Sequence, residues 1–310
     1  MWKGNWLRIA ISAALGTVIL WRVPMAALGS AFQSVRLGWI LAALGCVALM
    51  LLARWCRWHR LLAVSGQVLP ARDSARSLLG GFTLGAVAPG RLGELGRCLF
   101  LGESSRPPAL LLNVLDRALD MWALASFMVV SLMALAPRPY GVFALGIWLA
   151  LLPVAMGLPA FVPSLAGLRW WGADFRSKLV AAAQPLRTLR IAPFAAWAFL
   201  STALDLMTFF CLLRAFTAAD LRAALVTFPW IVTAGGLPLS VGGLGPREGA
   251  AAMLLARYAI PSAVAVDAAL LLHVFSGLLP AAAGALWLAC SRAQVGLSQA
   301  GRAATLLQEP

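Results

Sequence analysis

Long apolar runs recur along this chain, and each is close to the roughly 20 residues that a helix needs to cross the hydrocarbon core of a membrane. The six runs are residues 6–21, 37–55, 109–136, 140–165, 191–213 and 263–290. Only 12% of the residues are charged, against about 25% in soluble globular chains. The predicted fold class is therefore all-α, a polytopic transmembrane helix bundle with about six full spans.

The basic residues indicate how the chain is oriented. A net charge of +14 could suggest a nucleic-acid partner, but that function needs an exposed basic face, and here the arginines flank apolar runs. With the N-terminus inside, the cytoplasmic side would hold Lys3, Arg8, Arg54, Arg57, Arg60, Arg72, Arg76, Arg169, Arg176, Lys178, Arg187, Arg190, Arg292 and Arg302. The other side would keep only Arg22, Arg36, Arg138, Arg214 and Arg222. The positive-inside rule then predicts a multi-pass protein of the bacterial inner membrane with both termini in the cytoplasm.

Cysteine and histidine are sparse. The five cysteines lack paired spacing, and the two histidines are His59 in a basic loop and His273 inside an apolar run. We therefore expect no disulfide, no metal site and no cofactor. His273 is interpreted either as a structural residue or as a functional one, as any histidine inside a membrane can be.

Two apolar stretches, residues 78–94 and 228–249, are broken by glycine and proline. Each has an apolar half-helix, a turn rich in these breakers, and then an arginine and a glutamate that open a new helical segment (95–101 and 250–258). The pattern is typical of a re-entrant hairpin, because non-helical backbone at membrane depth is tolerated only where protein or a watery cavity covers it.

The order span, span, hairpin, span occurs twice. Because each unit has an odd number of full spans, the second is expected to be inverted, so that the first hairpin enters from the cytoplasm and the second from the opposite face. The single transmembrane domain (1–310) would contain unit one (1–137) and unit two (140–292). Paired broken helices in inverted halves indicate the central site of a transporter. Residues 168–190 are predicted to be an interfacial amphipathic helix or a solvated loop, and 293–310 a polar tail without function.

The hairpin tips have the composition of an anion site. Glycines let the backbone approach a ligand, a helix start offers free N–H groups, and the planar arginine fork suits phosphate. The candidate substrate-binding residues are Gly90, Arg91 and Glu94 at the first tip and Gly243, Gly245, Arg247 and Glu248 at the second. In the alternative interpretation, each arginine pairs only with its nearby glutamate, which caps the helix, as a structural brace.

The third apolar run carries a polar stripe. Asn113, Asp116, Arg117 and Asp120 are three or four residues apart, so they share one face of a helix that must look into the bundle. They are further candidates for substrate binding, gating or proton relay, and a purely structural network is the alternative. Asp205 is a candidate proton-coupling group, and Asp267 is expected at the interface.

Three segments, 88–94, 116–120 and 238–249, resemble the lysylphosphatidylglycerol synthase transmembrane region family of flippase-like membrane proteins. The resemblance covers nearly the whole chain and implies two re-entrant hairpins; its best-understood members move a modified phospholipid between leaflets. The family's Pro-Gly-Arg and Glu at the first hairpin are matched by Pro89 to Arg91 and Glu94. The next span usually carries Glu-Arg and then Asp, and here Asp116 is a shorter first acid. The soluble aminoacyl-transferase domain of full synthases is not expected.

The leading functional hypothesis is a flippase or transporter for an anionic lipid or lipid-linked phosphate, such as a phospholipid, polyprenyl-phosphate or glycolipid. Arg91 and Arg247 would hold the phosphate, and the two units would rock against each other. The alternatives are an enzyme that uses Asp116 or Asp120 as a base on a lipid phosphate, and an accessory subunit of an envelope-lipid pathway. The expected partners are the lipid and the bilayer, with no nucleic acid. The sequence leaves open whether the protein forms an oligomer.

Overall fold

The computed structural model describes residues 35–64, 66–67, 69–102, 106–135, 140–146, 148–149, 177, 180, 189–236 and 245–290; the side chains of 87, 89–92 and 106–107 are outside this description. The described part of the chain is all-α. Its elements are α3 (Leu37–Val64), α4 (Ala71–Val87), the 3-10 helix η1 (Pro89–Phe100), α5 (Arg106–Leu135), α8 (Ala192–Phe216), α9 (Leu221–Gly236), α10 (Pro246–Leu255), η5 (Ala256–Tyr258), α11 (Ser262–His273) and the π-helical turn η6 (Val274–Leu278). After η6 the chain continues as helix to Cys290.

Four helices in these ranges are long and apolar enough to cross a membrane, namely Leu37–Val64, Pro108–Leu135, Ala192–Phe216 and Ser262–Cys290. They coincide with four of the six predicted spans. The run 6–21 is outside the described residues, as are most of 140–165, nearly all of 168–190 and all of 293–310. A count of six spans therefore stays a prediction.

Helix α3 is longer than the sequence predicted, and this changes the environment of three arginines. The apolar run stops at residue 55, but the helix continues to Val64. Arg54, Arg57 and Arg60 thus belong to the helix, whereas the charge count had assigned them to the cytoplasmic side, at and beyond the end of the apolar run. Arg54 and Arg57 are buried, which is possible because acidic side chains of α5 and α8 neutralise them.

Helices α3 and α8 pack antiparallel along their whole lengths. The amide of Arg36 donates to the carbonyl of Ala215 (3.1 Å) at one end, and the Arg60 guanidinium lies 5.4 Å from the ring centroid of Trp197 at the other. This pair joins the first half of the chain to the second, because α3 and α8 are separated by more than a hundred residues in sequence.

The predicted breaker-rich stretch 78–94 forms a helical hairpin of α4 and η1. A Cβ added at Gly81 would lie 2.8 Å from Arg97 Cβ, and one at Gly85 would lie 2.6 Å from Glu94 Cγ. The position that comes first in α4 thus faces the residue that comes later in η1, so the two segments run antiparallel. The glycines let them approach more closely than ordinary side chains would allow.

The second breaker-rich stretch gives a second helix pair, α9 and α10. Gly235, near the end of α9, lies against the guanidinium of Arg247, which is the second residue of α10. Gly245 precedes α10 with a φ of +94°, a conformation that glycine adopts without strain. Most of the connection, residues 237–244, is outside the described range.

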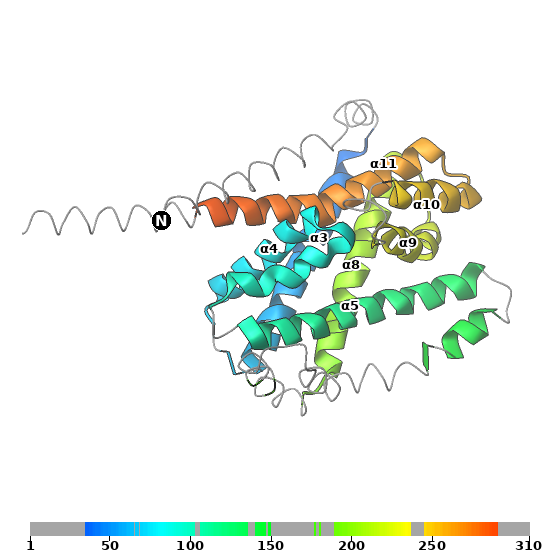
Figure 1. Cartoon of the computed structure of the whole chain (residues 1–310). Helices are drawn as coiled ribbons and strands as arrows, with labels where there is room; N and C mark the ends of the chain where they lie inside the picture. Colours follow the sequence, from blue (N-terminus) through cyan, green and yellow to red (C-terminus); the bar gives the residue numbers. More distant parts are fainter. Residues whose placement is uncertain are drawn as a thin grey trace, which may run out of the picture.

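Each pair packs against the long helix that ends the other half. Figure 1 shows α5 on one side of the bundle and α11 with its continuation on the other, with α4 and α9 between them. The hydroxyl of Thr83 in α4 donates to the carbonyl of Ala281 beyond η6 (2.9 Å), and that of Ser131 in α5 donates to the carbonyl of Val226 in α9 (2.5 Å). The contacts between the two halves are thus reciprocal.

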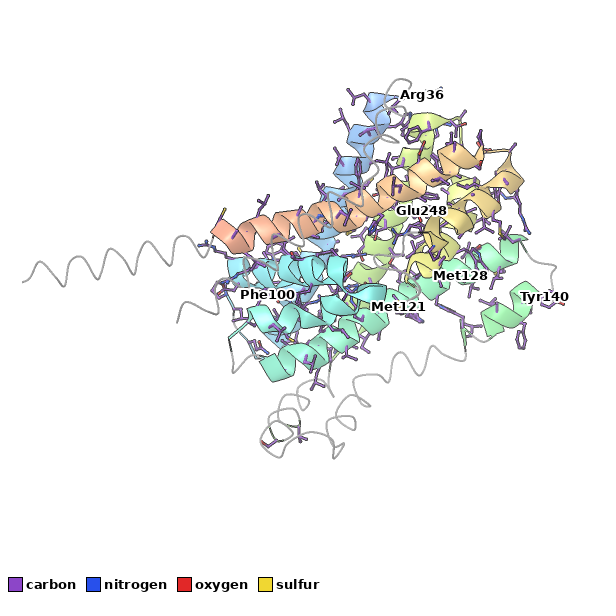
Figure 2. The ribbon with its side chains drawn as sticks, turned by 45° about the horizontal axis from the view of Figure 1, so that its top comes forward. Arg36, Phe100, Met121, Met128, Tyr140 and Glu248 are labelled. Carbon is purple, nitrogen blue, oxygen red and sulfur yellow. The ribbon has the colours of Figure 1, made fainter. Side chains whose placement is uncertain are left out.

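Apolar side chains cover the outside of the bundle as well as its inside. The ribbon with side chains in Figure 2 shows sticks such as that of Tyr140 projecting from the outer helices. Leu41 is 60% exposed and Leu286 67% exposed. Large apolar surface of this kind, spread along long helices, is suited to contact with lipid chains rather than with water.

Candidate functional site

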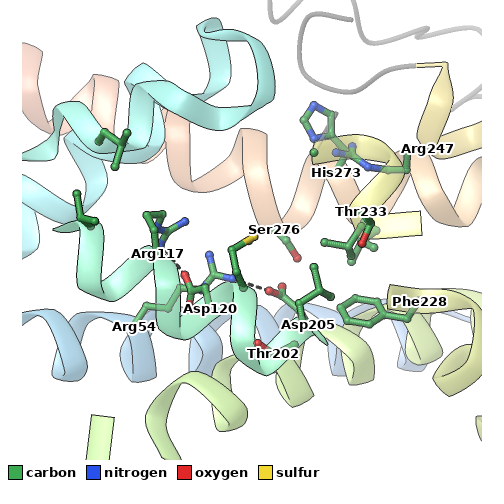
Figure 3. Close-up of a pocket in the computed structure, with 17 residues that line it drawn as sticks. Arg54, Arg117, Asp120, Thr202, Asp205, Phe228, Thr233, Arg247, His273 and Ser276 are labelled. Atoms are coloured by element: carbon green, nitrogen blue, oxygen red, sulfur yellow. Dashed lines mark hydrogen bonds and ion pairs between the residues drawn. The ribbon is translucent and has the colours of Figure 1, made fainter. Parts of the chain in front are cut away.

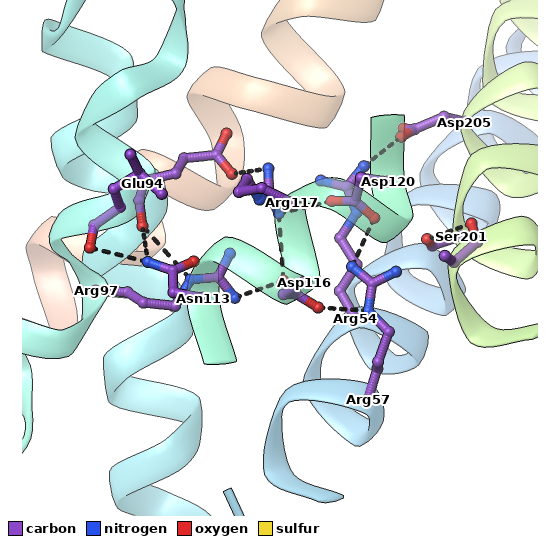
Figure 4. A network of polar contacts seen from close by, with 12 residues as sticks. Arg54, Arg57, Glu94, Arg97, Asn113, Asp116, Arg117, Asp120, Ser201 and Asp205 are labelled. Carbon is purple, nitrogen blue, oxygen red and sulfur yellow. Dashed lines mark hydrogen bonds and ion pairs between the residues drawn. The ribbon is translucent and has the colours of Figure 1, made fainter. Parts of the chain in front are cut away.

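The polar stripe of α5 lies at the centre of a buried ion network, shown in Figure 4. The two carboxylate oxygens of Asp116 bind Arg57 Nε (2.6 Å) and Arg97 Nη1 (2.9 Å). Those of Asp120 bind Arg57 Nη2 (2.6 Å) and Arg117 Nη2 (2.7 Å). Both acids therefore have both oxygens occupied by guanidinium groups.

The network ties the first hairpin to α5. Arg117 Nη1 donates to Glu94 Oε2 at 2.6 Å, and the amide of Asn113 donates to the carbonyls of Glu94 (3.1 Å) and Leu95 (2.8 Å). Arg97 is also stacked against Trp58, with its guanidinium carbon 4.6 Å from the ring centroid. Moving η1 away from α5 would leave buried charges without their partners, which is energetically costly. These contacts therefore hold η1 on α5.

A further ion pair joins the two halves of the chain. Arg54 of α3 donates from Nη2 to Asp205 Oδ2 of α8 at 2.7 Å, and both side chains are largely buried. Asp205, a candidate proton-coupling group in the sequence, thus has a cationic partner, and its proton-coupling role stays a prediction. Together, the four arginines at 54, 57, 97 and 117 balance the four acids at 94, 116, 120 and 205.

At the second helix pair, α9 and α10, Arg247 and Glu248 have different surroundings. Arg247 is buried, and a Cβ at Gly235 would lie 2.6 Å from its Nη2, so only glycine leaves room for the guanidinium. Glu248 instead accepts a hydrogen bond from the backbone N–H of Gly245 (2.6 Å), at the start of α10. A carboxylate there is favoured by the positive end of the helix dipole.

A cavity of about 540 Å³ lies between the two halves and brings several of these groups together. Its charged lining residues are Arg54, Arg117, Asp120, Asp205 and Arg247. Its apolar wall consists of Leu95, Val114, Met121, Leu124, Phe228, Val232 and Leu272, and its neutral polar residues include Thr202, Thr233, His273 and Ser276. In Figure 3, Arg247 and His273 lie toward one end and Arg117 and Asp120 toward the other.

The remaining predicted site residues are placed as follows. Gly90 and Arg91 lie in the first turn of η1, and the side chain of Arg91 is outside the described part of the chain, as is the whole of Gly243. Asn113 and Asp116 are buried in the ion network and do not line the cavity, whereas Arg117 and Asp120 belong to both. Asp267 lies in α11, partly exposed.

Sequence reasoning missed Arg54, Arg57 and Arg97 as members of the site. A signal was present for the first two, because residues 54 and 57 are three apart and fall on one face of a helix that extends the apolar run. No comparable signal marks Arg97, whose burial depends on the close approach of η1 to α4 and α5. Within the described ranges, no group of three or more His, Cys, Asp or Glu residues could hold a metal ion.

The sequence matches one known family over most of its length. Residues 5–284 match the family described as the Lysylphosphatidylglycerol synthase TM region. No curated protein matches the chain. The family match covers most of the 310 residues and agrees with the resemblance carried by the hairpin and stripe motifs. The chain therefore belongs to the lysylphosphatidylglycerol synthase transmembrane region family, and it is a multi-pass membrane protein.

Proposed function

We propose that this protein moves an anionic lipid or lipid-linked phosphate between the leaflets of the bacterial inner membrane. The observation that carries the proposal is the cavity between the two halves, which combines an apolar wall with guanidinium groups from both of them. An apolar wall suits the part of the lipid next to its acyl chains, and an arginine fork suits a phosphate.

Arg247 is the proposed main phosphate ligand. It enters the cavity from the start of α10, where the helix dipole also favours an anion. Arg117 faces the cavity too, but both of its Nη atoms are bound to carboxylates, Glu94 and Asp120. Arg91, at the other hairpin tip, stays a proposed ligand by analogy of position.

Two features support an inverted, re-entrant architecture for this transporter. The antiparallel packing of α3 and α8 is what inversion requires of corresponding spans, and each helix pair contacts the long helix that ends the other half. In this proposal the pairs enter from opposite faces, both termini are cytoplasmic, and rocking of the two halves opens the cavity alternately to each leaflet.

We propose transport rather than chemistry on the lipid. The two acids considered as general bases, Asp116 and Asp120, each have both oxygens bound to arginine. Neither is free to take a proton from a substrate without breaking the network. A base must be within hydrogen-bond reach of the proton that it removes.

A translocation assay in proteoliposomes tests the proposal. Purified protein is reconstituted with a fluorescent phosphatidylglycerol, and the fraction that moves to the inner leaflet is followed by quenching of the outer leaflet. We expect Arg247→Gln to lower the rate at least about tenfold, because a charge-assisted hydrogen bond is worth about 1.5–3 kcal/mol. Arg257→Gln is the matched control, since Arg257 is exposed in η5, near the end of α10. Equal rates for wild type and protein-free vesicles would refute the transport proposal.

A further inference from the structure

Within the described part of the chain, the Arg54–Asp205 pair leaves a carboxylate oxygen unbound as well as guanidinium nitrogens, whereas both oxygens of Asp116 and of Asp120 are bound to arginines. Arg54 is 8% exposed and uses only Nη2 on Asp205. Its Nε and Nη1 atoms and the Oδ1 atom of Asp205 are buried and have no hydrogen-bond partner among the described residues. Both residues line the cavity. Leaving buried donors and acceptors unpaired is costly, so the site is suited to a ligand that binds both.

Nearby groups extend this polar patch. Ser276 Oγ, in the π-helical turn η6, also lines the cavity, is buried and lacks a partner within the described ranges. Single π-helical turns inside α-helices occur frequently at functional sites. By contrast, Arg117 has carboxylates on both Nη atoms. Among the described residues that line the cavity, Arg54, Asp205 and Ser276 therefore leave buried hydrogen-bonding atoms without a partner, whereas Arg117 leaves only its Nε.

A hydroxyl group matches this patch better than other head-group chemistry. A hydroxyl donates one hydrogen bond, which Asp205 Oδ1 can accept, and it accepts hydrogen bonds, which Arg54 can donate. A primary ammonium can donate to Asp205 but can accept nothing from Arg54, and it is repelled by the guanidinium. A quaternary ammonium can do neither, and an alkyl group would leave all of these atoms unpaired.

We infer that the Arg54–Asp205 pair binds head-group hydroxyls, so that the cavity selects a phosphodiester lipid with a glycerol or sugar head group. The inference rests on the proposed function, since it assumes that a lipid enters the cavity. The phosphate lies toward Arg247, and the hydroxyls, which are attached beyond the phosphate, reach the pair formed between α3 and α8. Arg54 and Asp205 are thus specificity-determining residues, while Arg247 serves any anionic lipid.

The test compares two lipids that differ only in these hydroxyls. Phosphatidylglycerol and phosphatidylethanol are both singly charged phosphodiesters, and only the former carries head-group hydroxyls. Both are added in equal amounts to the full-length protein in detergent, and the bound lipids are quantified by mass spectrometry. We expect wild type to prefer phosphatidylglycerol at least about fivefold, since two or more hydrogen bonds distinguish the lipids.

Variants test whether the Arg54–Asp205 pair causes the preference for phosphatidylglycerol. The double variant Arg54→Met, Asp205→Leu replaces both charged groups by apolar side chains, so that no hydrogen-bonding group remains there and no charge is left buried and unpaired. We expect its preference ratio to fall to near one. Arg60→Gln is the control on the same helix, because Arg60 is exposed and stacks on Trp197. A ratio measured within one preparation does not depend on the fraction of protein that is folded.

The outcomes separate this inference from the proposed function. No preference in wild type, or a preference that persists in the double variant, overturns the inference even if anionic lipids are translocated. Preference with no translocation in vesicles supports hydroxyl recognition and refutes the transport proposal. Free glycerol 3-phosphate is included as a competitor, and displacement of the lipid at equal concentration would assign the cavity to a soluble polyol phosphate and overturn the lipid class.

Discussion

At the scale of single residues, some ion-paired side chains are enclosed in the buried network, some line the cavity, and Arg117 and Asp120 do both. Asp116 is enclosed by Arg57 and Arg97 and does not reach the cavity, whereas Arg54 and Asp205 face it. A buried ion network needs every member, since the desolvation of each charge is offset only by its partners. Arginine and aspartate thus stabilise the fold within the ion network, and the same residue types are proposed to bind a ligand at the cavity.

Substitution of Asp116 tests whether the buried ion network stabilises the fold. In Asp116→Asn, two buried guanidinium groups lose a carboxylate, so we expect the free energy of unfolding to fall by about 3–5 kcal/mol. Equilibrium unfolding in mixed micelles, followed by circular dichroism, measures the change. Asp267→Asn is the control, because Asp267 has no ion pair among the described residues. Similar losses in both variants would mean that the network does not stabilise the fold.

At the scale of elements, glycines decide how closely the first hairpin closes. A Cβ at Gly93 would collide with the carbonyl group of Leu84, so the backbones of η1 and α4 are in direct contact there. This closeness lets Glu94 and Arg97 extend from η1 to α5. The unusually long 3-10 segment, Pro89–Phe100, is held by these contacts rather than by its own hydrogen bonds, which are weaker than those of an α-helix.

Two glycine substitutions distinguish the effect of close helix packing from that of helix propensity. Gly93→Ala forces η1 away from α4, and we expect a loss of about 1–3 kcal/mol in unfolding free energy. Gly45→Ala on α3 meets nothing within 4 Å and should be neutral or stabilising by up to about 1 kcal/mol. Thermal unfolding of the two variants side by side measures the difference. A Gly93 variant as stable as the Gly45 variant would contradict the closed hairpin.

At the scale of the whole molecule, α3 and α8 form a contact between the two halves that extends along both helices. The Arg54–Asp205 pair lies near the middle of both helices, and the cavity is lined from both halves. Cys46 of α3 and Cys211 of α8 lie on these same two helices, close enough for their thiols to interact. Binding in the cavity and packing of the halves are therefore physically linked.

The thiol pair offers a test of this arrangement. In a variant without Cys56, Cys98 and Cys290, mild oxidation should link Cys46 to Cys211 within one chain. Peptide mass spectrometry after digestion detects the linked pair, which is separated by more than 150 residues in sequence. A further Cys211→Ala exchange should abolish the product. Persistent free thiols under conditions that oxidise exposed cysteines would contradict the antiparallel packing of α3 on α8.

The sequence by itself determined the features that depend on neighbouring residues. Apolar runs predicted the helical membrane class and four spans that the structure contains. Breakers located the two helix pairs, and a three-and-four spacing placed Asp116, Arg117 and Asp120 on one inward face. Motifs in the same segments indicated the family that the match then showed. All of these signals are local, because they arise from hydrophobicity, backbone preference and helical period.

Only the tertiary structure decided which charges meet. Arg54 and Asp205 are 151 positions apart. The spacing of Arg54 and Arg57 is compatible with one helix face, but no local pattern shows which acids they meet. Their burial depends on the length of α3, on the close approach allowed by the hairpin glycines and on acids from other helices. An ion pair between distant segments is determined by packing geometry, which a single sequence does not display, and so the cavity and its recognition groups became visible only in the folded chain.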